Sequence, residues 1–147
     1  HEALVQLRDV IKQDPKNPYA YYYTGTALFE LGRFDACIDA YRAAIRLAPM
    51  YNAARIGLSH SLRIAGEPRE AIQQARKALD YRPNDSDALF ALGLAQAAMG
   101  DRRGAISTLQ TFLESGPELE IAIEARAVLE RLTGGEKPSN DDDEDDD

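Results

Sequence analysis

The chain has 147 residues, of which 44% are apolar, and its formal net charge is −8 at pH 7. The seven residues 141–147, DDDEDDD, carry nearly all of this charge, because without them 17 basic residues face 18 acidic ones. The near-neutral body argues against nucleic acid as the main ligand, and a single cysteine excludes an internal disulfide.

The sequence repeats itself with a period of about 34 residues. Prolines and glycines each mark one place in the period, at Pro15, Pro49, Pro83 and Pro117, and at Gly32, Gly66, Gly100 and Gly134. Self-similarity over about 20 to 50 residues is typical of stacked repeat architectures. We therefore expect one all-α domain whose helices stack in chain order.

Residues 2–13 are predicted to form a helix that would be the second helix of a repeat. Its apolar stripe is Leu4, Leu7, Val10 and Ile11, and part of that stripe would meet a preceding helix. We therefore expect further repeats upstream. Exposed apolar surface on this open N-terminal helix could also mediate self-association.

Three helix pairs are predicted next, at about 18–31 and 34–47, 52–65 and 68–81, and 86–99 and 102–115. Asn17 can cap the first of these helices, with Pro18 at its first position, where the missing N–H costs nothing. Asn84, Asp85 and Ser86 supply capping oxygens to another. Short turns at the glycines predict antiparallel neighbours.

A capping helix is predicted from Pro117 to Leu132. It offers an apolar set to the stack, whereas Arg126 and Glu130 give it the polar outer face that a terminal helix requires; the apolar set is Leu119, Ala122, Ile123, Ala125 and Val128. Residues 134–147 lose the periodicity and are predicted to form a disordered acidic tail. That tail could be a solvated segment, a lure for a basic partner or, least favoured, a divalent-cation ligand.

These units resemble the tetratricopeptide repeat, a helix–turn–helix of this length. In the first full unit the resemblance rests on Tyr21, Gly25, Gly32, Cys37, Tyr41, Ala44 and Pro49. It covers residues 2–133: a half-repeat 2–15, repeats 18–51, 52–85 and 86–119, and the capping helix 117–132. It implies a right-handed superhelical solenoid of antiparallel helix pairs. The departures are Arg55 in an aromatic position, Ala75 in the position of Tyr41, and the bulky Phe112 where the family has alanine.

The resemblance also implies that the first helices line a concave groove for a protein or peptide. Helical spacing puts ten candidate partner-binding residues on that face: Tyr19, Tyr22, Thr26, Phe29, Ile56, His60, Arg63, Ile64, Phe90 and Leu94. Their surplus apolar surface favours docking of a peptide or partner helix. In the simpler interpretation, Tyr22 and Phe90 only fill space between successive helices.

One branch of the family binds the terminal carboxylate of chaperone tails through lysines and asparagines. The matching positions here lack that cationic clamp, and Arg63 alone could pair with an acidic group; they hold Tyr22, Thr26, Gly57, Asp87 and Ala91. A chaperone-tail ligand is therefore not expected.

Catalysis has few candidate residues in this sequence. His60 and Ser59 are adjacent but face different sides of a helix, and the chain has no zinc-ligand spacing and no phosphate-binding glycine loop. No apolar run reaches the roughly 18 residues of a membrane-spanning helix, and no signal peptide is visible. We expect a cytoplasmic, non-catalytic interaction module without metal or cofactor, or alternatively a self-assembling scaffold of a larger complex.

Overall fold

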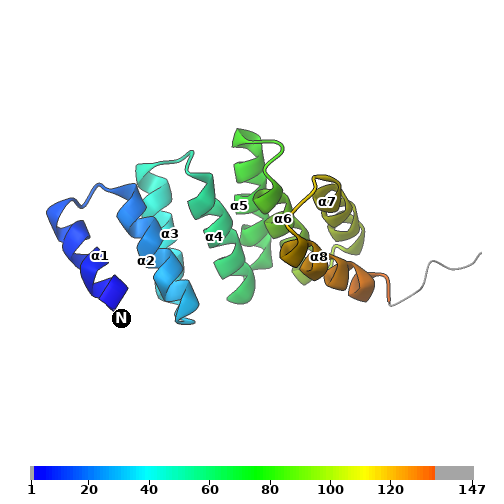
Figure 1. The fold of residues 1–147 in the computed structure, drawn as a ribbon, viewed down its shortest axis with the longest axis horizontal. Coiled ribbons are helices and arrows are strands. Elements are labelled where there is room, and N and C mark those ends of the chain that lie inside the picture. The colour runs from blue at the N-terminus through cyan, green and yellow to red at the C-terminus, as the bar shows by residue number, and fades with distance from the viewer. Residues whose placement is uncertain (1, 135–147) are drawn as a thin grey trace, which may run out of the picture.

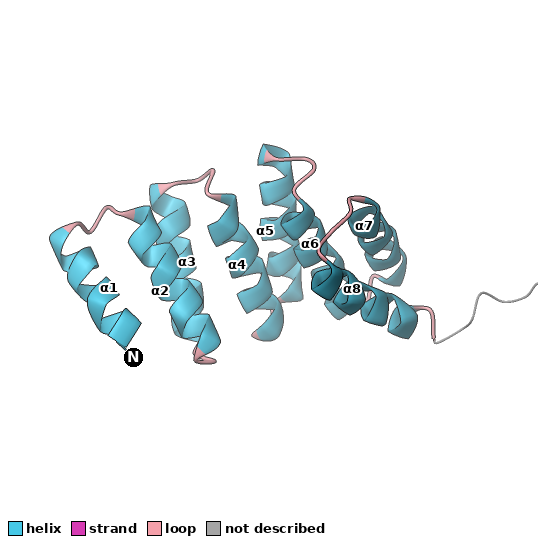
Figure 2. Ribbon diagram, in the orientation of Figure 1, coloured by secondary structure: helices cyan, strands magenta, loops and turns pink. Residues whose placement is uncertain are grey.

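The computed structural model describes residues 2–134, and the predicted acidic tail beyond them lies outside the described residues. Within residues 2–134 the chain is an all-α solenoid of eight helices and no strands (Figures 1 and 2). The helices are α1 (Glu2–Gln13), α2 (Pro18–Glu30), α3 (Phe34–Leu47), α4 (Asn52–Ile64), α5 (Pro68–Tyr81), α6 (Ser86–Met99), α7 (Arg102–Glu114) and α8 (Leu119–Leu132).

The helices begin and end where the repeat places its capping and turn residues. The Asn17 side chain accepts hydrogen bonds from the backbone N–H groups of Tyr19 and Ala20, and Asp85 does the same at the start of α6. Gly32, Gly66 and Gly100 follow the first helix of each pair with φ between 74° and 87°. Residues with a side chain rarely adopt this left-handed backbone conformation, so glycine suits these turns.

The helices stack in chain order from α1 to α8 (Figure 1). Each first helix packs against its own second helix, as α2 does with α3, and also against the next first helix, as α2 does with α4. The two larger core clusters fill the space between these layers, one around Leu58 and Leu62 and the other around Leu109 and Phe112. This arrangement leaves one edge of α2, α4, α6 and α8 facing a common space.

Close helix approach depends on a small residue opposite a ring or branched side chain. Tyr41 is 4% exposed, and its ring lies against both Gly25 and Gly57. A Cβ atom on Gly25 would lie 2.7 Å from Tyr41 Cδ1, and one on Gly57 would lie 2.6 Å from Tyr41 Cζ. In the second repeat the ring is replaced by Ala75, and the facing position holds Ser59, whose hydroxyl donates to the Ala71 carbonyl.

The last helix departs from the prediction in two respects. It begins at Leu119, not at Pro117, and Leu119 and Ile123 are 69% and 56% exposed, so their prediction as stack-closing residues is wrong. Ala122, Ala125 and Val128 are buried as expected. They define a stripe with spacings of three residues, and Leu119 and Ile123 point away from it. No helix in residues 2–134 is long and apolar enough to cross a bilayer.

Candidate functional site

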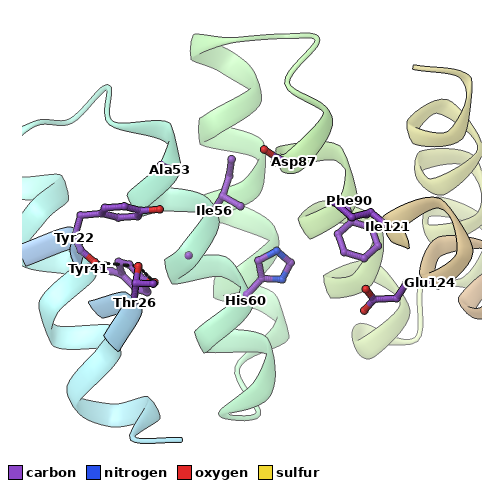
Figure 3. A pocket seen from close by; sticks show the side chains of 11 residues that line it. Tyr22, Thr26, Tyr41, Ala53, Ile56, His60, Asp87, Phe90, Ile121 and Glu124 are labelled. Carbon is purple, nitrogen blue, oxygen red and sulfur yellow. Dashed lines mark hydrogen bonds between the residues drawn. The ribbon is translucent and has the colours of Figure 1, made fainter. Parts of the chain in front are cut away.

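A central pocket of about 450 Å³ lies along the shared edge of the first helices (Figure 3). Three positions of the repeat supply most of its lining. The first position gives Ala53, Asp87 and Ile121, the second Tyr22, Ile56, Phe90 and Glu124, and the third Thr26 and His60, with Tyr41 and Gly57 beneath them. Successive members of each set are one period apart, so they occupy equivalent places on successive helices. The repeat itself therefore builds the pocket.

Tyrosines form the end of the central pocket at α2. The Tyr22 ring centroid lies 5.1 Å from that of Tyr51 and 5.9 Å from that of Tyr41. Burial raises the pKa of Tyr41 to about 12, so its phenol is neutral and lies 3.1 Å from the Thr26 hydroxyl. Tyr22 is only half-buried. One part of its ring therefore packs between helices, as the simpler interpretation predicts, while the rest lines the pocket.

The middle of the central pocket carries a neutral histidine. Desolvation by burial, assisted by the neighbouring Arg63 cation, lowers the pKa of His60 to about 4. Arg63 Nη2 lies 3.3 Å from His60 Nδ1. Because a guanidinium group only donates, Nδ1 is the acceptor, and the ring proton is on Nε2. His60 therefore offers an N–H donor, not a general base, near neutral pH.

The far end of the central pocket combines an aromatic wall with carboxylates. The Phe90 ring lies 5.2 Å from Phe112 and 6.1 Å from His60, centroid to centroid. Asp87 and Glu124 are exposed and also line the pocket, and Glu124 comes from α8. These two carboxylates give the apolar pocket an acidic rim, and the Arg63 cation beside the pocket is close enough to Glu124 to interact with it electrostatically.

The structure brings five of the ten predicted partner-binding residues together in the central pocket: Tyr22, Thr26, Ile56, His60 and Phe90. Arg63 lies beside it as the hydrogen-bond partner of His60. Tyr19, Phe29 and Ile64 lie outside its lining, with Tyr19 packed edge-on against Tyr51.

The prediction that Leu94 lies on the partner-binding concave surface is wrong. It is 9% exposed and belongs to the core cluster with Phe112 and Val128, because α8 packs over this part of α6. Its side chain is therefore unavailable to a partner.

Sequence reasoning missed Ile121 and Glu124, which complete the central pocket from α8. The signal was present in the repeat register, since Ile121 follows Asp87 by one period and Glu124 follows Phe90 by the same interval. The prediction treated α8 only as a cap. It is also the fourth helix to contribute to this surface.

Chemistry at a metal ion has no visible site in the part of the chain that the structure describes. No three histidine, cysteine, aspartate or glutamate side chains in residues 2–134 are grouped so that they could hold a metal ion. Cys37 is fully buried, and burial raises the pKa of its thiol. The arrangement is suited to apolar contacts and hydrogen bonding.

Comparison with known families finds the same repeat on both halves of the chain. Two family models described as tetratricopeptide repeat match residues 1–55 and 62–132. Human DnaJ homolog subfamily C member 3 is 29% identical over 86 residues, which are 58% of this chain and 17% of that protein. Anaphase-promoting complex subunit 7 of Arabidopsis thaliana is 30% identical over 118 residues, which are 80% of this chain and 20% of the relative. The chain thus spans about a fifth of the length of these curated relatives.

Solved structures share the architecture. The crystal structure of MamA protein is 30% identical, with a TM-score of 0.71 and coverage of 78% of this chain and 62% of that one. The first tetratricopeptide domain of Spaghetti (RPAP3), bound to the HSP90 peptide SRMEEVD, is 19% identical, with a TM-score of 0.71 and coverage of 82% and 96%. The second likeness concerns the fold alone.

Proposed function

Because the chain belongs to the tetratricopeptide repeat family, we propose that it is a non-catalytic interaction module whose central pocket binds an apolar peptide or partner helix. The observation that carries the proposal is the pocket of about 450 Å³ that four successive first helices line with partly exposed apolar side chains. Aromatic side chains of this kind often provide most of the energy at protein interfaces. Tyr22 and Phe90 are the central anchors.

The charges of the central pocket indicate which partner fits. Asp87 and Glu124 supply negative charge, and His60 supplies a neutral donor. A segment with apolar side chains and a nearby lysine or arginine complements this lining. A peptide ending in acidic residues would instead meet two carboxylates, with Arg63 beside Glu124 but no clamp of several cations. We therefore do not expect this chain to bind a peptide like the HSP90 peptide SRMEEVD of the RPAP3 domain.

The experiment requires a substitution that blocks the central pocket without removing core contacts. Tyr22 and Phe90 also pack against neighbouring helices, so truncating them would lower stability as well as affinity. Ala53 lines the pocket and is exposed, so Ala53→Arg adds bulk and a positive charge at the mouth, where the charge opposes a basic partner. Ala127→Arg adds the same side chain to an exposed position of α8 outside the pocket and serves as the matched control.

We expect Ala53→Arg to lose partners that the wild-type chain and Ala127→Arg both retain in affinity capture from a native lysate. Titration of a purified partner should then show about a tenfold or greater loss of affinity for Ala53→Arg, the equivalent of about 1.4 kcal/mol. Equal affinities for the two variants would contradict binding in the central pocket.

A further inference from the structure

A second cleft lies between α1 and α2, on the opposite side of α2 from the central pocket. Its volume is about 290 Å³, its apolar wall is Leu4, Ile11 and Leu28, and its rim carries three cations, Arg8, Lys12 and Arg33. No acidic side chain lines it. Thr24 lines this cleft and Tyr22 lines the central pocket, and the two residues lie about 200° apart around α2.

The same cleft recurs one repeat later. Arg42, Ile45, Arg46 and Leu58 each follow a residue of the α1–α2 cleft by one period, and they line a cleft that is also about 290 Å³. This second copy remains open although α1 and α2 precede it. In this later cleft the preceding helices therefore leave the surface open.

One of the differences between the two clefts is a carboxylate beside the arginine. In the later cleft Arg42 forms an ion pair with Glu70, at 2.7 Å, the only side-chain ion pair within residues 2–134. The residue one period before Glu70 is Ala36, which is exposed. Arg8 thus occupies the position of Arg42 without the carboxylate that Arg42 binds. In the later cleft the arginine binds a carboxylate, and no equivalent carboxylate stands one period earlier.

We propose that the α1–α2 cleft binds the acidic residues 141–147 of a second copy of this chain. These seven consecutive acids complement the three rim cations, and cations beside an apolar wall attract anions more strongly than cations on an open surface. The cleft is lined by α1, and α1 and the end of the described chain lie at opposite ends of the solenoid (Figure 1), which favours a second copy. This contact combines two of the alternatives that the sequence left open, self-association of the chain and binding of the tail to a basic partner.

This contact is heterologous, because the tail of one copy meets the cleft of the next. Such contacts extend into open chains when rotation between copies does not close a ring. The attraction is between exposed charges, so we expect it to be weak and to disappear at high salt, where screening shortens to about 3 Å at 1 M. The association is thus distinct from peptide binding in the central pocket.

Sedimentation equilibrium of the full chain tests the assembly. At low salt the average mass should rise with protein concentration, and in 1 M salt it should equal the monomer mass. A full-chain variant in which each acid of residues 141–147 is replaced by its amide should remain a monomer in both conditions. A concentration-independent mass for the wild-type chain at low salt would overturn the proposal.

Fluorescence anisotropy of a labelled peptide, residues 136–147, tests the cleft. The peptide should bind the tail-amide chain, and Arg8→Glu with Lys12→Glu should weaken binding about tenfold or more. Ala36→Glu should also weaken it, by supplying Arg8 with the carboxylate that Glu70 gives Arg42, whereas Ala36→Gln should not. Reversal of two exposed arginines on α7, Arg102→Glu with Arg103→Glu, is the charge-matched control.

Equal affinities for the two charge-reversed chains would contradict the assigned cleft. Peptide binding without wild-type assembly would place the tail in its own cleft and overturn the second-copy assignment.

Discussion

Tyr41 shows how single residues set the spacing of the helices. Its ring fills the gap between α2 and α4 that Gly25 and Gly57 leave open, and its hydroxyl lies beside Thr26 in the central pocket. The same side chain therefore joins two repeats and forms part of the pocket floor. The glycines are required by this ring, not by a turn, since both are in helices.

Gly25→Ala and Gly57→Ala should each destabilise the chain by about 1–3 kcal/mol, because the added methyl group would overlap the buried ring. Urea unfolding monitored by circular dichroism measures this. In a Tyr41→Ala background, which copies Ala75 of the second repeat, the same glycine substitutions should be neutral or stabilising, since alanine favours helix over glycine by about 1 kcal/mol. An unchanged penalty in that background would rule out the ring as the cause.

His60 links the pocket to the pH dependence of stability. Its pKa is about 4 in the folded chain against an ordinary value of 6.5, because burial and Arg63 disfavour the imidazolium ion. Between these two values the unfolded chain binds the proton and the folded chain does not, so stability falls as pH is lowered from 6.5 to 4.

Between pH 7 and pH 4 the free energy of unfolding should fall by roughly 3 kcal/mol more for the wild-type chain than for His60→Gln. Chemical denaturation of both proteins across this range provides the test. The carboxylates contribute equally to both proteins, so the difference between the two stabilities reports on His60 alone. Parallel curves for the two proteins would show that His60 titrates normally.

At the scale of the element, different side chains make the same joint between helices. In the first repeat the Tyr21 hydroxyl donates to the Pro15 carbonyl at 3.0 Å. One repeat later Arg55 Nε donates to the Pro49 carbonyl at 3.0 Å, and its Nη1 donates to Gln74 at 2.9 Å. Arg55 thus occupies an aromatic position without losing the contact between the helix and the preceding loop. It is buried, at 7% exposure.

Arg55→Ala should cost about 2–4 kcal/mol, because it removes packing and leaves the Gln74 and Pro49 oxygens without their charged donor. Arg55→Tyr should retain much of this stability by copying Tyr21. Thermal unfolding of the two variants distinguishes the explanations. If Arg55→Tyr were as unstable as Arg55→Ala, the contact with the Pro49 carbonyl would not be the reason for the residue.

The helix boundaries could be predicted closely because proline, glycine and capping residues mark each period. The six helices from α2 to α7 end within one residue of their predicted bounds. The orientation of α8 could not be predicted in the same way. Its sequence offers apolar residues on two faces, and only packing against α6 and α7 decides that Ala122 and Val128 are buried while Leu119 is exposed.

At the scale of the whole molecule, stacking converts a repeated sequence position into a continuous surface. The central pocket exists because equivalent positions of α2, α4, α6 and α8 face the same space. Repeat register predicts which residues share this surface, but not where it ends. Leu94 follows His60 by one period, yet α8 covers it. Burial of that kind depends on contacts between elements, which a single sequence does not contain.

Hydrogen exchange of the full chain, with and without a purified partner, tests the central claim most directly. We predict that the partner slows exchange in α2, α4 and α6, whose side chains line the central pocket, while α5 and α7 change little. Protection confined to α3, α5 and α7 would show that the partner binds the opposite face and would contradict the account.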